Sequence, residues 1–157
     1  MALEIIEVTE LSQTIIDLAL HCIKATGFHL ISSTASPEEF TNTLKDHSVN
    51  PNKFFVCAFM DGKAVGTFLG QVTQYPFTKD LVAAELYTYV LPEYQGLGIG
   101  AEMLAEFENW GKQKGAKFAI FGVTEIVSNN SQRGNDFALS KGYLKFSSEY
   151  FKVLENV

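Results

Sequence analysis

Three glycines near the middle of the chain, together with the glutamine before them, form the segment best suited to chemistry. Gln95, Gly96, Gly98 and Gly100 follow Pro92, which ends a predicted strand, and an amphipathic helical pattern begins directly after them. Glycine lets the backbone come close to a ligand, and the first N–H groups of a helix have no partner within the helix. The helix dipole adds roughly half a positive charge at this end. The segment therefore predicts a site for a phosphate or pyrophosphate group.

Two other nucleotide-binding motifs fit this segment less well. The run Gly96-x-Gly98-x-x-Ala101 matches the dinucleotide-binding fingerprint in form, and Glu125, at the end of the next predicted strand, is a possible ribose acceptor. However, residues 92–95 separate the strand from the first glycine, whereas the fingerprint turns immediately. The strands before the segment are joined as hairpins, and too little chain follows for a doubly wound sheet. A phosphate-binding P-loop is excluded because the chain has no Gly-Lys-Ser/Thr sequence.

Counted as Gln95-x-x-Gly98-x-Gly100, the same segment resembles the pyrophosphate loop of the GNAT superfamily of N-acetyltransferases, which is Gln/Arg-x-x-Gly-x-Gly/Ala. The resemblance extends beyond the loop. It includes three further segments of the family pattern. These are the fourth strand with its entry to the helix (residues 89–96), the end of that helix (107–116), and the terminal helix with the Gly-aromatic pair after it (137–143). It therefore covers nearly the whole chain, and it is similar to small bacterial and phage-type members.

This resemblance implies that acetyl-CoA lies between two strands that splay apart. Backbone groups near Tyr89 and Val90 would pair with the pantetheine amides, and Ser131, which falls on the family's Asn position, would contact the cofactor. The Gln95 side chain would add a donor where many relatives use Arg, so that one ionic contact is missing. The pyrophosphate would be held by the backbone amides of the loop: Gly96, Leu97, Gly98, Ile99, Gly100 and Ala101.

Acetyl transfer to an amine needs a neutral nucleophile, and therefore a general base. The family's bases are carboxylates on or beside the fourth strand, and Glu85 matches that position. Two-residue periodicity predicts that Glu85, Tyr87 and Tyr89 share one face of the strand. The plain alternative is a solvated carboxylate. Glu125 is a second candidate, and a loop charge is an equal explanation for it.

The family's general acid is a Tyr in the pattern Asn-x-x-Ala-x-x-Leu-Tyr-x-x-x-Gly-Phe. In this chain Gly142 and Tyr143 fall on the Gly-Phe pair, whereas Ala138 falls on the Tyr. Either water or another hydroxyl, from Tyr143 or Ser131, protonates the CoA thiolate, or the protein has lost catalysis. A thiol pKa of about 8.5 makes the leaving group tolerable without a dedicated acid. The two hypotheses are direct acetyl transfer to a primary amine and a non-catalytic acyl-CoA-binding or partner-binding module.

The elements that position these residues follow from hydrophobic periodicity and turn signals. Asp61-Gly62 predicts a two-residue hairpin between two strands, and Ser36-Pro37-x-Glu39 predicts a capped helix start. Predicted strands cover residues 3–8, 54–60, 64–75, 81–91 and 118–124, with a final strand pair from 142 to 153. Predicted helices cover residues 9–25, a segment starting at 36, a segment from the glycines to 115, and 136–141, with a polar loop at 128–134.

The order of elements predicts one mixed α/β domain over residues 1–157. The resemblance implies a central, mostly antiparallel sheet of six to seven strands, splayed between the fourth and fifth and flanked by about four helices. It also implies a possible homodimer, because dimers are common in the family.

The composition of the chain limits the binding partners, the metal content and the cellular compartment that we expect. The net charge of −6 disfavours nucleic-acid binding and suits a cationic amine. Cys22 and Cys57 are far apart and predict buried thiols in a reducing compartment. His21, His29 and His47 lack metal-ligand spacing, so no metal is expected. The acidic start lacks a signal-peptide pattern, and no apolar run approaches about 18 residues, so we expect a cytoplasmic protein without a membrane span.

Overall fold

The computed structural model describes residues 2–26, 32, 34–123, 131–150, 152 and 154. Its strands are β1 (Leu3–Glu7), β2 (Lys53–Met60), β3 (Lys63–Gln74), β4 (Leu81–Val90) and β5 (Ala116–Ile120). Its helices are α1 (Gln13–Thr26), α2 (Pro37–Val49), α3 (Ile99–Gln113) and α4 (Ser131–Ser140), and a short 3-10 helix covers Pro92–Tyr94.

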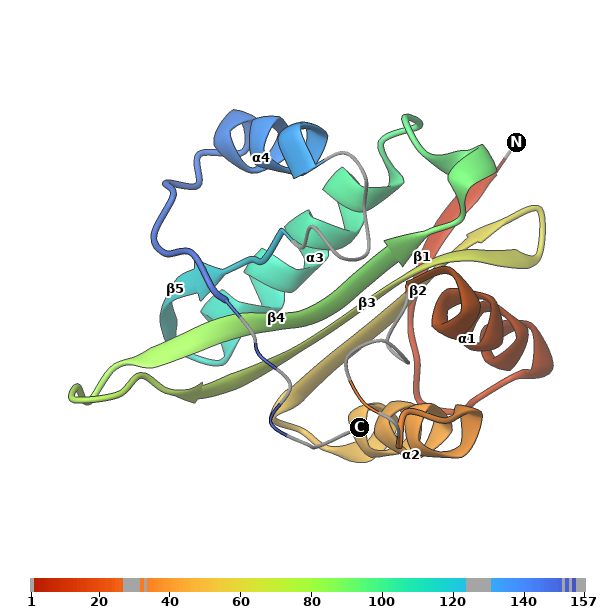
Figure 1. The fold of residues 1–157 in the computed structure, drawn as a ribbon, viewed down its shortest axis with the longest axis horizontal. Helices are drawn as coiled ribbons and strands as arrows, with labels where there is room; N and C mark the ends of the chain where they lie inside the picture. Colours follow the sequence, from red (N-terminus) through yellow and green to blue (C-terminus); the bar gives the residue numbers. More distant parts are fainter. Residues whose placement is uncertain are drawn as a thin grey trace.

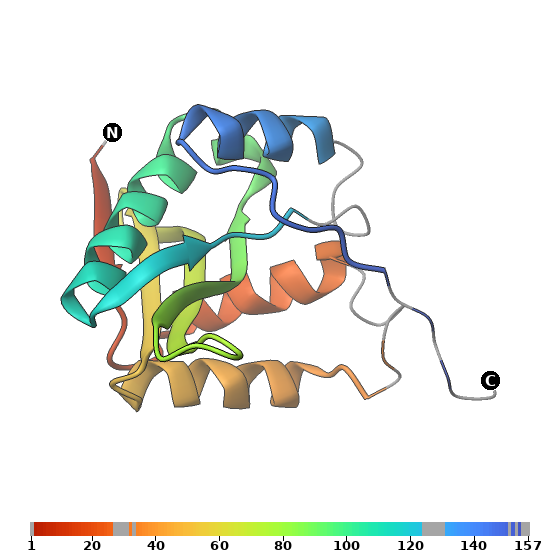
Figure 2. The ribbon, with the colours of Figure 1, turned by 90° about the vertical axis from the view of Figure 1, so that its left-hand side faces the viewer.

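The five strands form one sheet in the order β1-β2-β3-β4-β5. The pairs from β1 to β4 are antiparallel, and β4 pairs with β5 in parallel. Helices α3 and α4 lie on one side of this sheet, and α1 and α2 lie on the other (Figures 1 and 2). The fold is thus the mixed α/β architecture that the sequence predicts, with α3 as the crossover between the two parallel strands.

Local sequence explains the ends of several elements. The β2–β3 hairpin turns at Asp61 and Gly62, whose φ angles of 50° and 82° are both positive, as a type I′ turn requires. The α2 helix begins at Pro37, and the Ser36 hydroxyl accepts the Glu39 N–H at 3.2 Å. Helix α1 begins later than the predicted residue 9, because the backbone at Val8 still pairs with β2: its N–H donates to the Phe55 carbonyl at 2.9 Å.

The core between the sheet and α3 is aromatic. Phe68 of β3 stacks against Phe107 of α3 with ring centroids 4.7 Å apart, and Phe54 of β2 packs against both rings. Gly70 of β3 makes room for this cluster, because a methyl group there would lie 2.5 Å from the Phe107 ring. The close approach explains why glycine interrupts a β-rich strand.

Two predictions near the C-terminus are wrong. Residues 131–134, expected in a polar loop, form the first turn of α4, where Gly134 packs closely on Val123 and Gln132 donates to Asp136 at 2.7 Å. Residues 143–150, expected in a final strand pair, form no strand. The backbone N–H groups that begin this segment close the end of α4 instead, since Tyr143 N–H donates to the Ala138 carbonyl. Within the described residues the sheet therefore has five strands, not six to seven.

Candidate active site

The site begins where β4 and β5 separate. Their pairing runs from Leu81 opposite Ala116 to Ala84 opposite Ile120, and the remaining residues of β4 have no partner in β5. On its other side β4 stays paired with β3 along its whole length. One edge of β4 is therefore open over residues 85–90, next to the end of β5.

Backbone groups of alternate residues point toward this opening. The Leu91 N–H donates to the carbonyl of Val65 in β3 at 2.9 Å, so Leu91 and Val65 are a hydrogen-bonded pair across the two chain segments. In an antiparallel ladder the neighbouring residues then direct their N–H and C=O groups away from the partner strand. Val90 and Thr88 therefore face the open edge. The Gln95 amide already donates to the Val90 carbonyl at 3.0 Å, so the side chain predicted to contact the cofactor lies directly over this edge.

The glycine turn lies between the end of β4 and the start of α3. Gly96 and Gly98 have φ angles of 81° and 84°, in the left-handed region that favours glycine. Gly98 is the residue before α3, and a methyl group on Gly98 or Gly100 would meet no atom within 4 Å. The backbone around the first N–H groups of α3, those of Ile99, Gly100 and Ala101, is therefore uncrowded. This arrangement provides N–H groups for an anion.

Glu85 lies at the point where the two strands separate. Its two carboxylate oxygens accept hydrogen bonds from the Thr88 hydroxyl at 3.0 Å and from the backbone N–H of Gly122, just after β5, at 3.2 Å. Burial raises the pKa of Glu85 to about 7, against the smaller lowering effect of these two bonds. A carboxyl group with a pKa near neutrality suits a general base.

The faces of β4 differ from the prediction. Leu69 pairs with Tyr87 and Gly70 pairs with Glu85, so Leu86 is an extra residue in a β-bulge. Gly70 faces α3, and cross-strand partners share a face, so Glu85 lies on the α3 side. Leu69 and Tyr87 lie on the opposite side. The expectation that Glu85, Tyr87 and Tyr89 share one face is therefore wrong, because the bulge shifts the alternation by one residue.

The two tyrosines meet α1 and α2 instead. The Tyr87 ring packs edge-on against Phe40 of α2, with centroids 5.6 Å apart, and burial raises the pKa of its hydroxyl. The Tyr89 hydroxyl lies 2.9 Å from Nδ1 of His21 on α1. The bulge therefore gives the open part of β4 a carboxylate on one side and two phenols on the other.

Helix α4 is attached to α3 and to the chain beyond β5. Phe121 packs on Phe137 and Tyr143, with centroids 5.9 Å apart in each pair. The Tyr143 hydroxyl donates to Glu108 of α3 at 3.0 Å, and burial and that carboxylate raise its pKa. This hydroxyl is thus engaged with α3. Ser131 begins α4, and its side chain, like Glu125 and His29, lies outside the described residues.

Other features bear on binding partners. Among the described residues no group of three His, Cys, Asp or Glu side chains could hold a metal ion. No described helix is long and apolar enough to cross a membrane.

Comparisons with known proteins identify the architecture. A model of the acetyltransferase (GNAT) family matches residues 18–133, which include β4, the glycine turn, α3 and β5. The chain belongs to this family. The match spans both predicted halves of the site, the strand edge and the glycine turn.

Solved structures of GNAT acetyltransferases share the fold. The aminoglycoside acetyltransferase AAC(6')-Iy, in complex with the bisubstrate analog CoA-S-monomethyl-acetylneamine, has a TM-score of 0.72 at 14% identity, covering 99% of this chain and 100% of that one. Glucosamine-6-phosphate N-acetyltransferase from Arabidopsis thaliana has a TM-score of 0.70 at 12% identity, with 99% and 100% covered. AAC(6')-Ih from Acinetobacter baumannii has a TM-score of 0.70 at 19% identity, with 99% of each chain covered. No match is found among curated protein sequences.

Three residues near the candidate site were not anticipated from the sequence. Thr88 and His21 meet Glu85 and Tyr89 only through the folded sheet. Arg133 of α4 lies against Gly96, since a methyl group on that glycine would be 3.5 Å from its Nη2. An arginine within the segment predicted as a polar loop carries no local signal for such a contact, whereas Tyr89 could have suggested a polar partner from its hydroxyl alone.

Proposed function

We propose that this protein transfers an acetyl group from acetyl-CoA directly to a primary amine. The observation that carries the proposal is the juxtaposition of three features: the open edge of β4, the glycine turn at the start of α3, and Glu85 where β4 and β5 separate. The open edge would pair with the pantetheine amides through the backbone groups of Thr88 and Val90, which face it. The turn would bind the pyrophosphate through the amides from Gly96 to Ala101.

In this proposal Glu85 acts as the general base, directly or through one water molecule. The amine nitrogen attacks the thioester carbonyl carbon, the new N–C bond forms, and the C–S bond breaks. The proton lost by the nitrogen moves to the Glu85 carboxylate. Its pKa of about 7 supports this role, because about half of the group is ionised at pH 7 and the carboxylate is basic enough to accept a proton.

The CoA thiolate needs a proton, and we assign that step to water. Ala138 stands where the family has its Tyr, and the Tyr143 hydroxyl is engaged with Glu108. A thiolate with a pKa of about 8.5 is a moderate leaving group, so a dedicated acid is not required.

The experiment is acetyl transfer to a panel of amines, measured as release of the free CoA thiol. The panel contains amino sugars, polyamines, lysine peptides and peptides with free N-termini. Amino sugars are tested first because AAC(6')-Iy, AAC(6')-Ih and glucosamine-6-phosphate N-acetyltransferase share the fold. We expect amine-dependent thiol release. A protein that binds CoA but releases no thiol with any amine would contradict the proposal.

A non-catalytic acyl-CoA-binding or partner-binding module is the second candidate, and Ala138 is the observation that favours it. It predicts CoA binding without turnover, and a partner protein that co-purifies. Activity that disappears in Glu85→Gln would decide for the enzyme.

The setting of the reaction completes the proposal. Cys22 and Cys57 are both buried and form no disulfide, which suits a reducing compartment, so we propose a cytoplasmic enzyme formed by a single domain over residues 1–157. Native mass spectrometry would report both bound CoA and the homodimer that the family resemblance implies. A monomer carrying no CoA would count against both.

A further inference from the structure

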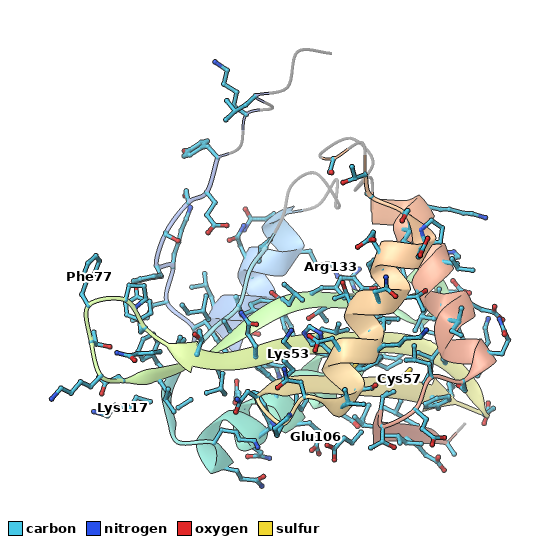
Figure 3. The ribbon with its side chains drawn as sticks, turned by 90° about the horizontal axis from the view of Figure 1, so that it is seen from below. Lys53, Cys57, Phe77, Glu106, Lys117 and Arg133 are labelled. Carbon is cyan, nitrogen blue, oxygen red and sulfur yellow. The ribbon has the colours of Figure 1, made fainter. Side chains whose placement is uncertain are left out.

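We propose that Arg133 supplies the cation that binds the pyrophosphate of CoA. This inference rests on the proposed function, and it assigns to α4 the ionic contact that a neutral Gln95 cannot make. The starting observation is the position of the Arg133 guanidinium beside the glycine turn: a methyl group on Gly96 would lie 3.5 Å from Nη2. Figure 3 labels this side chain.

The position of Arg133 follows from the way α4 is held. Phe137 lies one helical turn further along, on the same face of α4, and it packs against Phe121 beyond β5. Gly134 allows α4 to lie close to the chain there, since a methyl group on it would be 2.7 Å from the Val123 side chain. Tyr143, just past the helix, is bonded to Glu108 of α3. These contacts fix α4 alongside α3, so its first turn lies over the glycine turn.

Charge explains why a cation is needed at this point. The protein has a net charge of −6, and a pyrophosphate brings further negative charge. Backbone amides and the α3 dipole provide only partial positive charge. A guanidinium offers paired N–H donors that match two phosphate oxygens, and such charge-assisted bonds are about twice as strong as neutral ones. Arg133 is an exposed side chain of α4, so an incoming ligand can reach it.

Lys63 is a second cation near the turn and the rival for this role. The Lys63 ammonium is 5.7 Å from the centre of the Tyr94 ring, directly before Gln95. It comes from the β2–β3 hairpin, on the opposite side of the turn from α4. Lys141 provides a remote control, because its ammonium lies 5.9 Å from the centre of the Phe137 ring at the far end of α4.

The test is titration of the full-length protein and its variants with CoA and with dephospho-CoA, which keeps the pyrophosphate but lacks the 3′-phosphate. We expect Arg133→Gln to raise Kd about tenfold for both ligands, and Arg133→Lys to raise it severalfold, since lysine keeps the charge without the fork. Lys63→Gln and Lys141→Gln should change Kd less than twofold. Adding Gln95→Arg to Arg133→Gln should restore most of the affinity.

The outcomes separate the alternatives. Unchanged affinity in Arg133→Gln, or the same loss in Lys63→Gln, overturns the assignment. A loss with CoA that vanishes with dephospho-CoA assigns Arg133 to the 3′-phosphate and overturns the pyrophosphate contact. A large fall in the melting temperature of unliganded Arg133→Gln, with no rescue by Gln95→Arg, indicates a structural role instead. If the unmodified protein binds no CoA, the proposed function itself fails, which is distinct from failure of Arg133 alone.

Discussion

The two halves of β4 belong to one strand but differ in their partners. Residues 81–84 have a strand on each side and include Val82 and Ala83, which are buried. Residues 85–90 are paired with β3 alone and include Glu85 and Thr88, which bond to each other. In the first half the backbone groups are paired with strands on both edges and so stabilise the sheet. In the second half the groups that face away from β3 have no strand partner, and we propose that this edge pairs with the cofactor.

The bulge at Leu86 marks the boundary between the two halves. It separates Glu85, on the α3 side, from Tyr87 and Tyr89, on the side of α1 and α2. A regular strand would have carried all three to one face. Bulges near active sites redirect side chains in this way. The open half of β4 therefore offers different chemistry on its two sides, an acid–base group on one and phenols on the other.

The largest expected effect comes from removing the carboxylate at the boundary. In Glu85→Gln we expect kcat to fall by about 100-fold or more, because general base catalysis contributes roughly that much, while Kd for CoA changes little. Glu106→Gln is the matched control, since Glu106 is an exposed acid of α3 (Figure 3). Steady-state kinetics and CoA titration measure both. Equal activity in Glu85→Gln and Glu106→Gln would assign Glu85 to the fold.

The second effect is a pH dependence. The Glu85 carboxyl must be ionised to accept a proton, and its pKa is raised to about 7. Below that pH we expect protonation of Glu85 to lower kcat/KM by a further factor of about ten per pH unit, beyond the effect of the acceptor amine's own ionisation. The break near pH 7 should be absent in Glu85→Gln, which would retain only the ionisation of the acceptor amine. If the break near pH 7 persists unchanged in Glu85→Gln, the titrating group is the acceptor amine and not Glu85.

The same pKa predicts how stability changes with pH. Between the ordinary value of 4.5 and about 7, the folded protein keeps the Glu85 proton that the unfolded chain has lost. The folded state then binds more protons, so the free energy of unfolding falls as pH rises through this window. Urea unfolding at pH 4.5 and pH 8 should show a smaller difference for Glu85→Gln than for the unmodified protein.

The third effect concerns the glycine turn. An alanine at position 98 would have to adopt a φ near 84°, at a cost of about 1–2 kcal/mol. We expect Gly98→Ala to weaken CoA binding about tenfold, as the turn relaxes away from the amides of α3. Gly62→Ala is a close control, because Gly62 has a φ of 82°, also has no atom within 4 Å of an added methyl group, and lies in the β2–β3 hairpin. It should lower stability similarly and leave Kd unchanged. Equal Kd in both variants would remove the turn from the site.

These features differ in how far the sequence predicts them. Gly96, Gly98 and the start of α3 follow from local residues, because turn chemistry and helix starts depend on near neighbours. The bulge at Leu86 does not, since it depends on the pairing of β4 with β3, and neither strand encodes the register alone. The contact between Arg133 and Gly96 joins α4 to the loop before α3, and it exists only after both helices pack. The predicted strands after Gly142 were wrong for the same reason, because strand propensity cannot say whether a partner edge is available.

The smallest effect tests whether the Tyr143 hydroxyl stabilises the fold or acts as a general acid. Tyr143 donates its hydroxyl to Glu108, and a neutral donor lost from such a bond costs about 0.5–1.5 kcal/mol of stability. We therefore expect Tyr143→Phe to lower the free energy of unfolding by about 1 kcal/mol and to change kcat less than threefold. Denaturant unfolding and thiol release measure the two quantities. If Tyr143 instead protonated the thiolate, kcat would fall tenfold or more, and the loss would be greatest below the thiol pKa of about 8.5, where the leaving group takes up a proton. The open half of β4 would then need α4 for its chemistry as well as for holding the cofactor.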